Sequence, residues 1–161
     1  RRNNPEAEVP KLRAENALKG PVDHAVPVLR VQRPTGELIA ILFAYACHNT
    51  TLDFYQWCGD YAGFAQYALE EKHPGAVCLF VMGCGGDQNP IPRRQLELAQ
   101  QYGQKLADSV NRVLAQSMRD LAPSLTTATA RVTVDFADPP KREELVSCGF
   151  LLAVMSSSTM R

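Results

Sequence analysis

Two short stretches of this sequence gather side chains that can do chemistry. The first, Cys47-His48-Asn49-Thr50, comes at the end of the apolar run "LIAILFAYAC". The second is the glycine-rich loop "GCGGDQNP" (83–90), which follows the apolar run "AVCLFVM". Imidazole, thiol, carboxylate and amide groups bind metals, move protons or contact polar substrates. These two stretches are therefore the candidate site of the chain.

The elements around them predict that the two stretches lie at one edge of a sheet. The apolar runs at 38–47 and 76–82 are typical of strands covered on both faces, and between them residues 60–72 show helical periodicity. A long helix is expected from about 93 to 118. This order predicts an α/β fold, a βαβα unit with a mostly parallel sheet and flanking helices. Ligands of such sheets bind at the carboxyl ends of the strands, where the two stretches should meet.

The remaining segments carry weaker patterns. Residues 1–21 are polar and contain prolines, so an extended lead-in is expected, followed by a strand at 26–32. Residues 126–136 alternate imperfectly, like an exposed strand, and Asp60 is expected to cap the helix over 60–72. The chain opens without an initiator Met, which favours a piece of a longer protein.

Composition excludes several classes of function. The 161 residues balance 17 Lys and Arg against 17 Asp and Glu, so no charge excess marks a nucleic-acid-binding protein. No apolar run reaches the roughly 18 residues of a transmembrane helix. Five cysteines without a CxxC pair argue against a dense disulfide framework.

The side chains at the first stretch leave alternatives open. His48 is either a hydrogen-bonded core histidine or, at the end of a strand, a metal ligand or acid–base group. A single histidine cannot hold zinc, which takes three or four protein ligands. Cys47, His48, Cys58 and Cys84 have the right residue types for zinc, but their spacing matches no common zinc ribbon.

The glycine-rich loop also has two interpretations. It is either a nest for phosphate or a tight turn that lets the backbone approach a substrate, with Asp87 and Asn89 as polar contacts. The loop lacks the Lys-Ser/Thr ending of a P-loop, which favours the tight turn. Tyr55 and Trp57 either line the crevice beside it or pack the loop that follows the first strand.

Four segments, in this order and spacing, resemble the N-terminal catalytic domain of the neutral (alkaline, non-lysosomal) ceramidases, and bacterial proteins carrying that domain most of all. They are "GPVDHAVPVLRV", "FAYACHNTTL", "GDYAGFAQYALE" and "LFVMGCGGDQNP". The resemblance covers roughly residues 1–120, while 121–161 resemble the family only loosely. It implies that residues 1–161 are part of a larger catalytic domain and that the parent protein is exported or extracellular.

The resemblance also implies a zinc-dependent amidase that cleaves the N-acyl bond of ceramide, a sphingolipid. The family holds Zn²⁺ with two histidines, a glutamate and a tyrosine, and His48 matches one of those histidines. The other ligands would lie outside residues 1–161, so the remainder of the parent chain is expected to complete the site. Arg1 matches an arginine that lines the family's active site.

One departure from the family lies in the glycine-rich loop. Asn89 stands where the family has the serine assigned as nucleophile or essential catalytic residue. A carboxamide is no nucleophile, but it donates hydrogen bonds to a carbonyl or oxyanion. Asn89 is thus the candidate catalytic group, and Gly85, Gly86 and Asp87 are candidate substrate contacts.

The leading hypothesis is a zinc-dependent hydrolase fragment that acts on the N-acyl bond of a small-molecule or lipid substrate. The alternative is a non-catalytic lipid- or carbohydrate-binding module that kept the fold after losing the serine. A third interpretation is a structural domain in which His48 is a core histidine.

Overall fold

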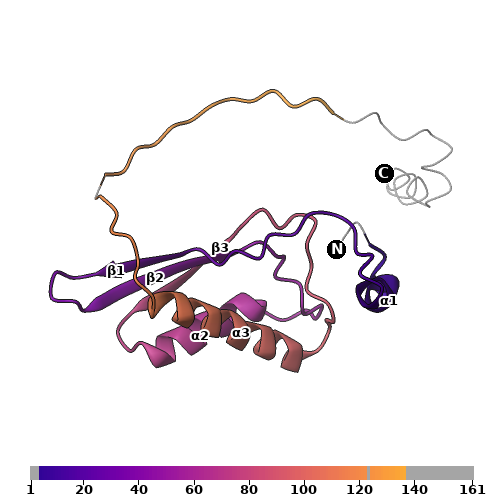
Figure 1. Ribbon diagram of the computed structural model, residues 1–161, viewed down its shortest axis with the longest axis horizontal. Coiled ribbons are helices and arrows are strands. Elements are labelled where there is room, and N and C mark those ends of the chain that lie inside the picture. The colour runs from indigo at the N-terminus through magenta and orange to yellow at the C-terminus, as the bar shows by residue number, and fades with distance from the viewer. Residues whose placement is uncertain (1–3, 123, 137–161) are drawn as a thin grey trace, which may run out of the picture. The chain divides into compact units, whose positions relative to one another are not determined.

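The computed structural model describes residues 4–122 and 124–136. The chain forms two compact units, Arg1–Asp120 and Leu121–Arg161. The helices and strands of the described residues all belong to the first unit (Figure 1). In chain order they are η1 (Glu6–Glu8), α1 (Val9–Ala14), β1 (Val28–Gln32), β2 (Leu38–Tyr45), α2 (Asp60–Lys72), β3 (Val77–Met82) and α3 (Leu96–Leu114).

The three strands form one sheet in the order β1-β2-β3. Strands β2 and β3 are parallel, with register from Ala40 opposite Val77 to Tyr45 opposite Met82, and α2 lies between them in the sequence. This confirms the predicted parallel pair with its helical connection. Strand β1 runs antiparallel to β2, because the turn at 33–37 is too short for a crossover. The sheet is therefore mixed.

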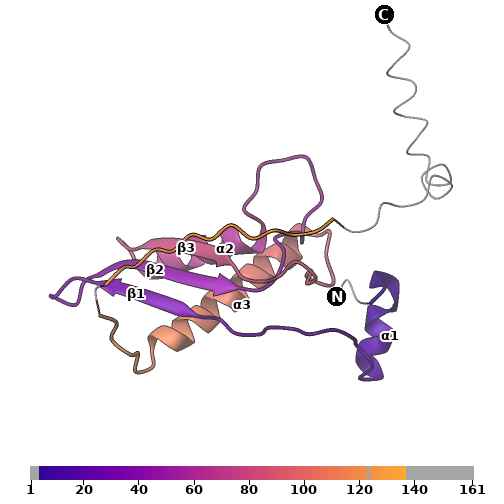
Figure 2. The ribbon, with the colours of Figure 1, turned by 90° about the horizontal axis from the view of Figure 1, so that it is seen from above.

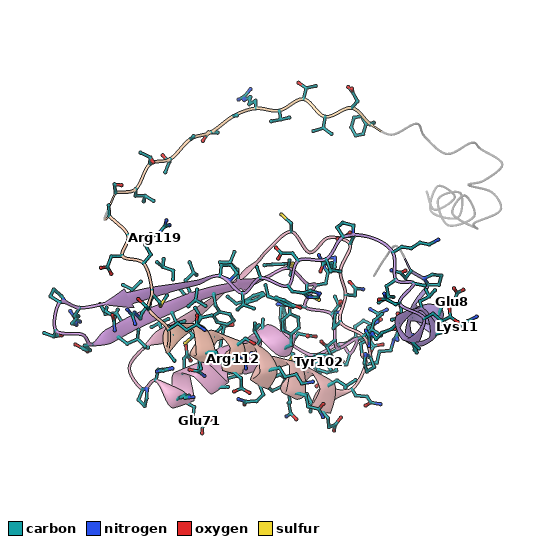
Figure 3. The ribbon with its side chains drawn as sticks, in the orientation of Figure 1. Glu8, Lys11, Glu71, Tyr102, Arg112 and Arg119 are labelled. Carbon is teal, nitrogen blue, oxygen red and sulfur yellow. The ribbon has the colours of Figure 1, made fainter. Side chains whose placement is uncertain are left out.

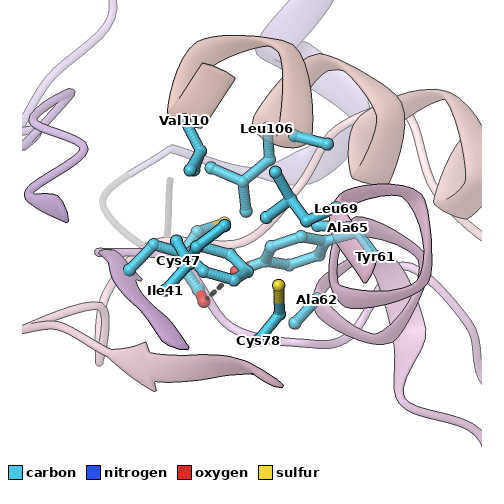
Figure 4. Packing of buried hydrophobic residues seen from close by; sticks show 11 residues of the cluster. Ile41, Cys47, Tyr61, Ala62, Ala65, Leu69, Cys78, Leu106 and Val110 are labelled. Carbon is cyan, nitrogen blue, oxygen red and sulfur yellow. Dashed lines mark hydrogen bonds between the residues drawn. The ribbon is translucent and has the colours of Figure 1, made fainter. Parts of the chain in front are cut away.

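Helices α2 and α3 lie together against one face of the sheet (Figure 2). The core between them contains Ile41, Phe43, Tyr61, Ala65, Leu69, Cys78, Leu106, Ala107 and Val110, all buried (Figure 4). Edge-to-face ring contacts join Phe80 to Phe43 and to Tyr61, with centroids 5.5 and 6.0 Å apart. Burial of this apolar surface is the main stabilising contribution to such a unit.

The opposite face of the sheet is open to solvent. Val77, Leu79 and Val81 of β3 are 54%, 48% and 47% exposed, and Leu29 and Val31 of β1 are each 40% exposed. The prediction that the apolar strands are covered on both faces is therefore wrong for the described residues. Both long helices pack on the same face, so the alternate side chains of β3 remain uncovered.

Side chains of α2 also satisfy backbone groups of β3. Gln66 Nε2 donates to the Cys78 carbonyl at 2.7 Å, and the Cys78 N–H donates to Glu70 Oε1 at 3.0 Å. Burial, and then the Glu70 carboxylate, raises the pKa of the Cys78 thiol to about 11. This thiol therefore stays protonated at neutral pH and acts as a core side chain.

Three predicted segments differ from the structure. Residues 1–21 are not wholly extended, because α1 forms there with Pro10 in its first turn, where proline is compatible with a helix. Helix α3 begins at Leu96 rather than near residue 93. Residues 126–136 form no strand, since an alternating pattern makes a strand only where a partner strand pairs with it.

Candidate functional site

The two polar stretches meet at the carboxyl end of the parallel pair. The His48 N–H donates to the Gln88 carbonyl at 2.9 Å, and His48 Nε2 lies 3.1 Å from the Gly86 carbonyl oxygen. Nearby, the Gly83 N–H donates to the Tyr45 carbonyl at 3.1 Å. The expectation that these stretches face each other across the sheet end is confirmed by these contacts.

The contact with Gly86 determines which ring nitrogen of His48 carries the proton. A carbonyl oxygen only accepts hydrogen bonds, so Nε2 must donate. In the neutral imidazole, Nδ1 then carries the lone pair and is the nitrogen that can accept a proton or bind a metal. Metal-binding histidines are commonly oriented by such a bond from their other ring nitrogen to a backbone carbonyl.

Gly85 allows the loop to come this close to the end of β2. A Cβ atom at this position would lie 2.6 Å from the Cys47 nitrogen and 2.9 Å from the Cys47 Cα. Any larger residue would push the loop away from the strand, because both neighbouring atoms are backbone. The glycine is therefore required by a close backbone approach, as expected for a tight turn.

Two side chains of helix α2 bind the backbone on either side of residues 48–51. Tyr61 is buried, and its hydroxyl donates to the Cys47 carbonyl at 2.6 Å (Figure 4). Burial is the main reason that the pKa of Tyr61 is raised, so its hydroxyl remains a donor. Asp60 accepts from the backbone N–H groups of Tyr61 at 2.7 Å and Leu52 at 2.9 Å. Its carboxylate thus binds one helix N–H and fixes the loop after β2. The predicted cap is not formed, because Gly59 occupies the N-cap position and Asp60 is the first residue of the helix.

Three side-chain oxygens next to His48 are buried without a hydrogen-bond partner among the described residues. They are Asn49 Oδ1, Thr50 Oγ1 and Thr51 Oγ1. Leaving such groups unsatisfied is costly, so native proteins rarely do it. These oxygens mark the His48 loop as a place that accepts further polar contacts.

A cavity of about 720 Å³ opens beside this loop. Its walls come from the N-terminal segment, the end of β2, the loop at 88–91 and helix α3. Its lining side chains include Tyr102, which Figure 3 labels, and Val9, Arg13, Lys19, His24, Tyr45, Tyr61, Asn89, Lys105 and Leu106. Burial raises the pKa of Tyr45, with smaller contributions from Cys47 and Asp23. Helix α1 and the segment after it were not expected to contribute to any site.

Only some of the predicted site residues lie at the cavity. Asn89 lines the cavity, whereas His48, Gly85, Gly86 and Asp87 do not, although Cys47 beside His48 does. Arg1 lies outside the described residues. Tyr55 and Trp57 are fully exposed and line a separate shallow depression, so they neither pack their loop nor line this cavity.

The described residues do not by themselves fit a zinc site. No group of three or more His, Cys, Asp and Glu side chains within 4–122 and 124–136 is arranged to hold a metal. The four-residue cluster of Cys47, His48, Cys58 and Cys84 is therefore not formed. The unsatisfied oxygens of Asn49 to Thr51 are neutral, unlike the histidine, cysteine and carboxylate ligands that zinc prefers.

No helix in the described part of the chain is long and apolar enough to cross a membrane. Comparison with models of known protein families and with curated protein sequences finds no match.

Proposed function

We propose that this chain is part of a hydrolase of the neutral ceramidase type, which cleaves an N-acyl bond in a small-molecule or lipid substrate. The observation that carries the proposal is the contact of His48 with the glycine-rich loop, through Nε2 to Gly86 and through its backbone to Gln88. This contact joins two of the four segments on which the resemblance rests. The cavity lined by Asn89 supplies a place for the substrate next to it.

In this proposal each group has a defined task. Asn89 donates a hydrogen bond to the scissile carbonyl, which stabilises the charge that develops on its oxygen. His48 Nδ1 is the basic nitrogen, available to take a proton or to bind a metal. Water adds to the carbonyl carbon and the C–N bond breaks, giving a carboxylic acid and an amine. Gly85, Gly86 and Asp87 belong to the loop that positions Asn89 and do not themselves line the cavity.

Zinc enters this proposal only as a cofactor whose other ligands lie outside residues 1–161. His48 would be a single ligand, because no group of three or more His, Cys, Asp and Glu side chains among the described residues is arranged to hold a metal. The same fact favours the alternative, a lipid- or carbohydrate-binding module without catalysis. Asn89 in place of a nucleophilic serine supports that alternative equally.

Hydrolysis of N-acyl compounds tests the proposal. Release of fatty acid from N-acylsphingosine and from soluble N-acyl amides is measured with this chain and with a longer protein that contains it. Activity should be abolished by His48→Ala and reduced about 100-fold or more by Asn89→Ala. His73→Ala is the control. The His73 imidazole contacts Asn111 Oδ1 at a distance of 2.8 Å, and His73 does not line the cavity. Binding of these compounds with no turnover by either protein would favour the binding module.

A further inference from the structure

The cavity beside the glycine-rich loop carries an excess of positive charge. Arg13, Lys19 and Lys105 line it, together with His24, whereas no aspartate or glutamate does. Within the described residues, no ion pair involves Arg13, Lys19 or Lys105. The whole chain has no net charge, so this excess is local. A concave surface lined by one sign of charge concentrates ligands of the opposite sign.

Among the described residues, two carboxylates near the cavity, Glu6 and Asp23, form no ion pair with these three cations. Glu6 is held by Arg93 and Arg94, at 2.6 and 2.7 Å. Asp23 is close enough to raise the pKa of Tyr45, but its carboxylate accepts from the Ala25 N–H at 2.8 Å and it does not line the cavity.

Lys105 is positioned at the cavity by an aromatic ring. Its ammonium group lies 5.9 Å from the centroid of the Tyr102 ring, and both side chains line the cavity. A cation over an aromatic face is held there by the ring's electrostatic field. The ammonium group of Lys105 is therefore held beside the cavity.

The inner walls of the same cavity are apolar. Val9 and Tyr61 are each 3% exposed and Leu106 is 7% exposed, while the three cationic side chains are exposed. A cavity of about 720 Å³ is within the size range of small-molecule sites. Its ligand should therefore combine an apolar body with a negatively charged group.

We propose that this cavity binds an N-acyl compound that bears a negative charge, such as an N-acyl amino acid, in preference to a neutral amide. The acyl chain packs against Val9 and Leu106, and the carboxylate meets the cations of Arg13, Lys19 and Lys105. That this ligand is a substrate rests on the proposed hydrolysis, whereas the preference for negative charge rests on the cavity alone.

A pair of ligands that differ only in charge tests the inference. Binding of N-octanoylglycine and of its neutral carboxamide, N-octanoylglycinamide, to the 161-residue chain is measured by titration calorimetry. The carboxylate should bind at least about tenfold more tightly at low salt, and the ratio should fall as salt screens the charges. Lys105→Gln and Arg13→Gln should each weaken carboxylate binding about fivefold and leave the carboxamide unchanged.

Lys72→Gln is the matched control, because Lys72 ends α2 and does not line the cavity. Equal affinity for the two ligands, no binding of either, or equal effects of Lys105→Gln and Lys72→Gln would each overturn the inference. The outcome is separable from the proposed hydrolysis. Charge-selective binding without turnover by the longer protein would refute only the hydrolysis, and turnover by that protein without charge preference would refute only the inference.

Discussion

At the scale of single residues, the position of His48 depends on Tyr61. The Tyr61 hydroxyl donates to the carbonyl of Cys47, the residue that immediately precedes His48. Tyr61→Phe removes only the hydroxyl group. The Cys47 carbonyl, which lies in a buried region, then loses the hydrogen bond from that hydroxyl. We expect the free energy of unfolding to fall by about 1–2 kcal/mol, measured by urea denaturation.

Tyr67→Phe is the control for this substitution, since Tyr67 lies on the same helix and is 72% exposed. Its free energy of unfolding should change by less than about 0.5 kcal/mol. Equal effects of the two substitutions would mean that the bond to Cys47 contributes nothing to stability. In that case Tyr61 would support the loop through packing alone.

Some residue-level features were accessible from the sequence and others were not. Placing His48 and the glycine-rich loop at two neighbouring strand ends was sufficient to predict that they meet. The choice of Nε2 as the donor to Gly86 was not predictable, because it depends on the orientation of a ring. The cationic cavity was also missed, since Arg13 and Lys105 come from distant segments with no shared pattern.

At the scale of elements, the contact between α2 and α3 depends on Gly103. A Cβ atom there would lie 2.5 Å from Phe64 Cβ and 2.7 Å from the Tyr61 carbonyl oxygen. Gly103→Ala would force the two helices apart, and overpacking of this kind costs about 1–3 kcal/mol. Thermal and urea unfolding should both report the loss.

Gly63→Ala is the opposite case within the same helix pair. Nothing lies within 4 Å of a Cβ atom at Gly63, which is inside α2. Alanine is the better helix former, so this substitution should raise the free energy of unfolding by up to about 1 kcal/mol. Destabilisation by both substitutions would contradict this prediction. It would mean that an alanine side chain does not fit at position 63.

The same scale explains which elements were predictable. Two apolar runs separated by a helical pattern specify a parallel pair, because the intervening helix leaves enough chain for a crossover. Helix α1 was not predictable from its prolines, because they favour extended chain in general but are tolerated in the first turn of a helix. The open face of the sheet was missed because a continuous apolar run does not reveal how many faces are covered.

At the scale of the first unit, one carboxylate ties the N-terminal segment to the chain beyond the glycine-rich loop. Glu6 accepts from Arg93 Nε and Nη2 at 3.0 and 2.6 Å, and from Arg94 Nη1 at 2.7 Å. Arg94 also approaches Asp53 at 3.4 Å. The segment held by Glu6 carries Val9, Arg13 and Lys19, so this ion pair fixes one wall of the cavity.

This arrangement predicts a dependence of stability on acid. The hydrogen bonds from Arg93, and then those from Arg94, lower the pKa of Glu6 to about 2 from its ordinary 4.5. Because the folded pKa is lower than the unfolded one, the contribution is fully present above pH 4.5 and is lost as the pH falls towards 2. Glu6→Gln should lower the Tm at pH 7. The difference in Tm between this variant and the unsubstituted protein should shrink below pH 4.5 and vanish near pH 2. Amide hydrogen exchange of residues 6–14 should be faster in Glu6→Gln than in the unsubstituted protein at pH 7, and the two rates should become equal near pH 2. A Tm difference that stays constant from pH 7 to 2 would exclude this role for Glu6.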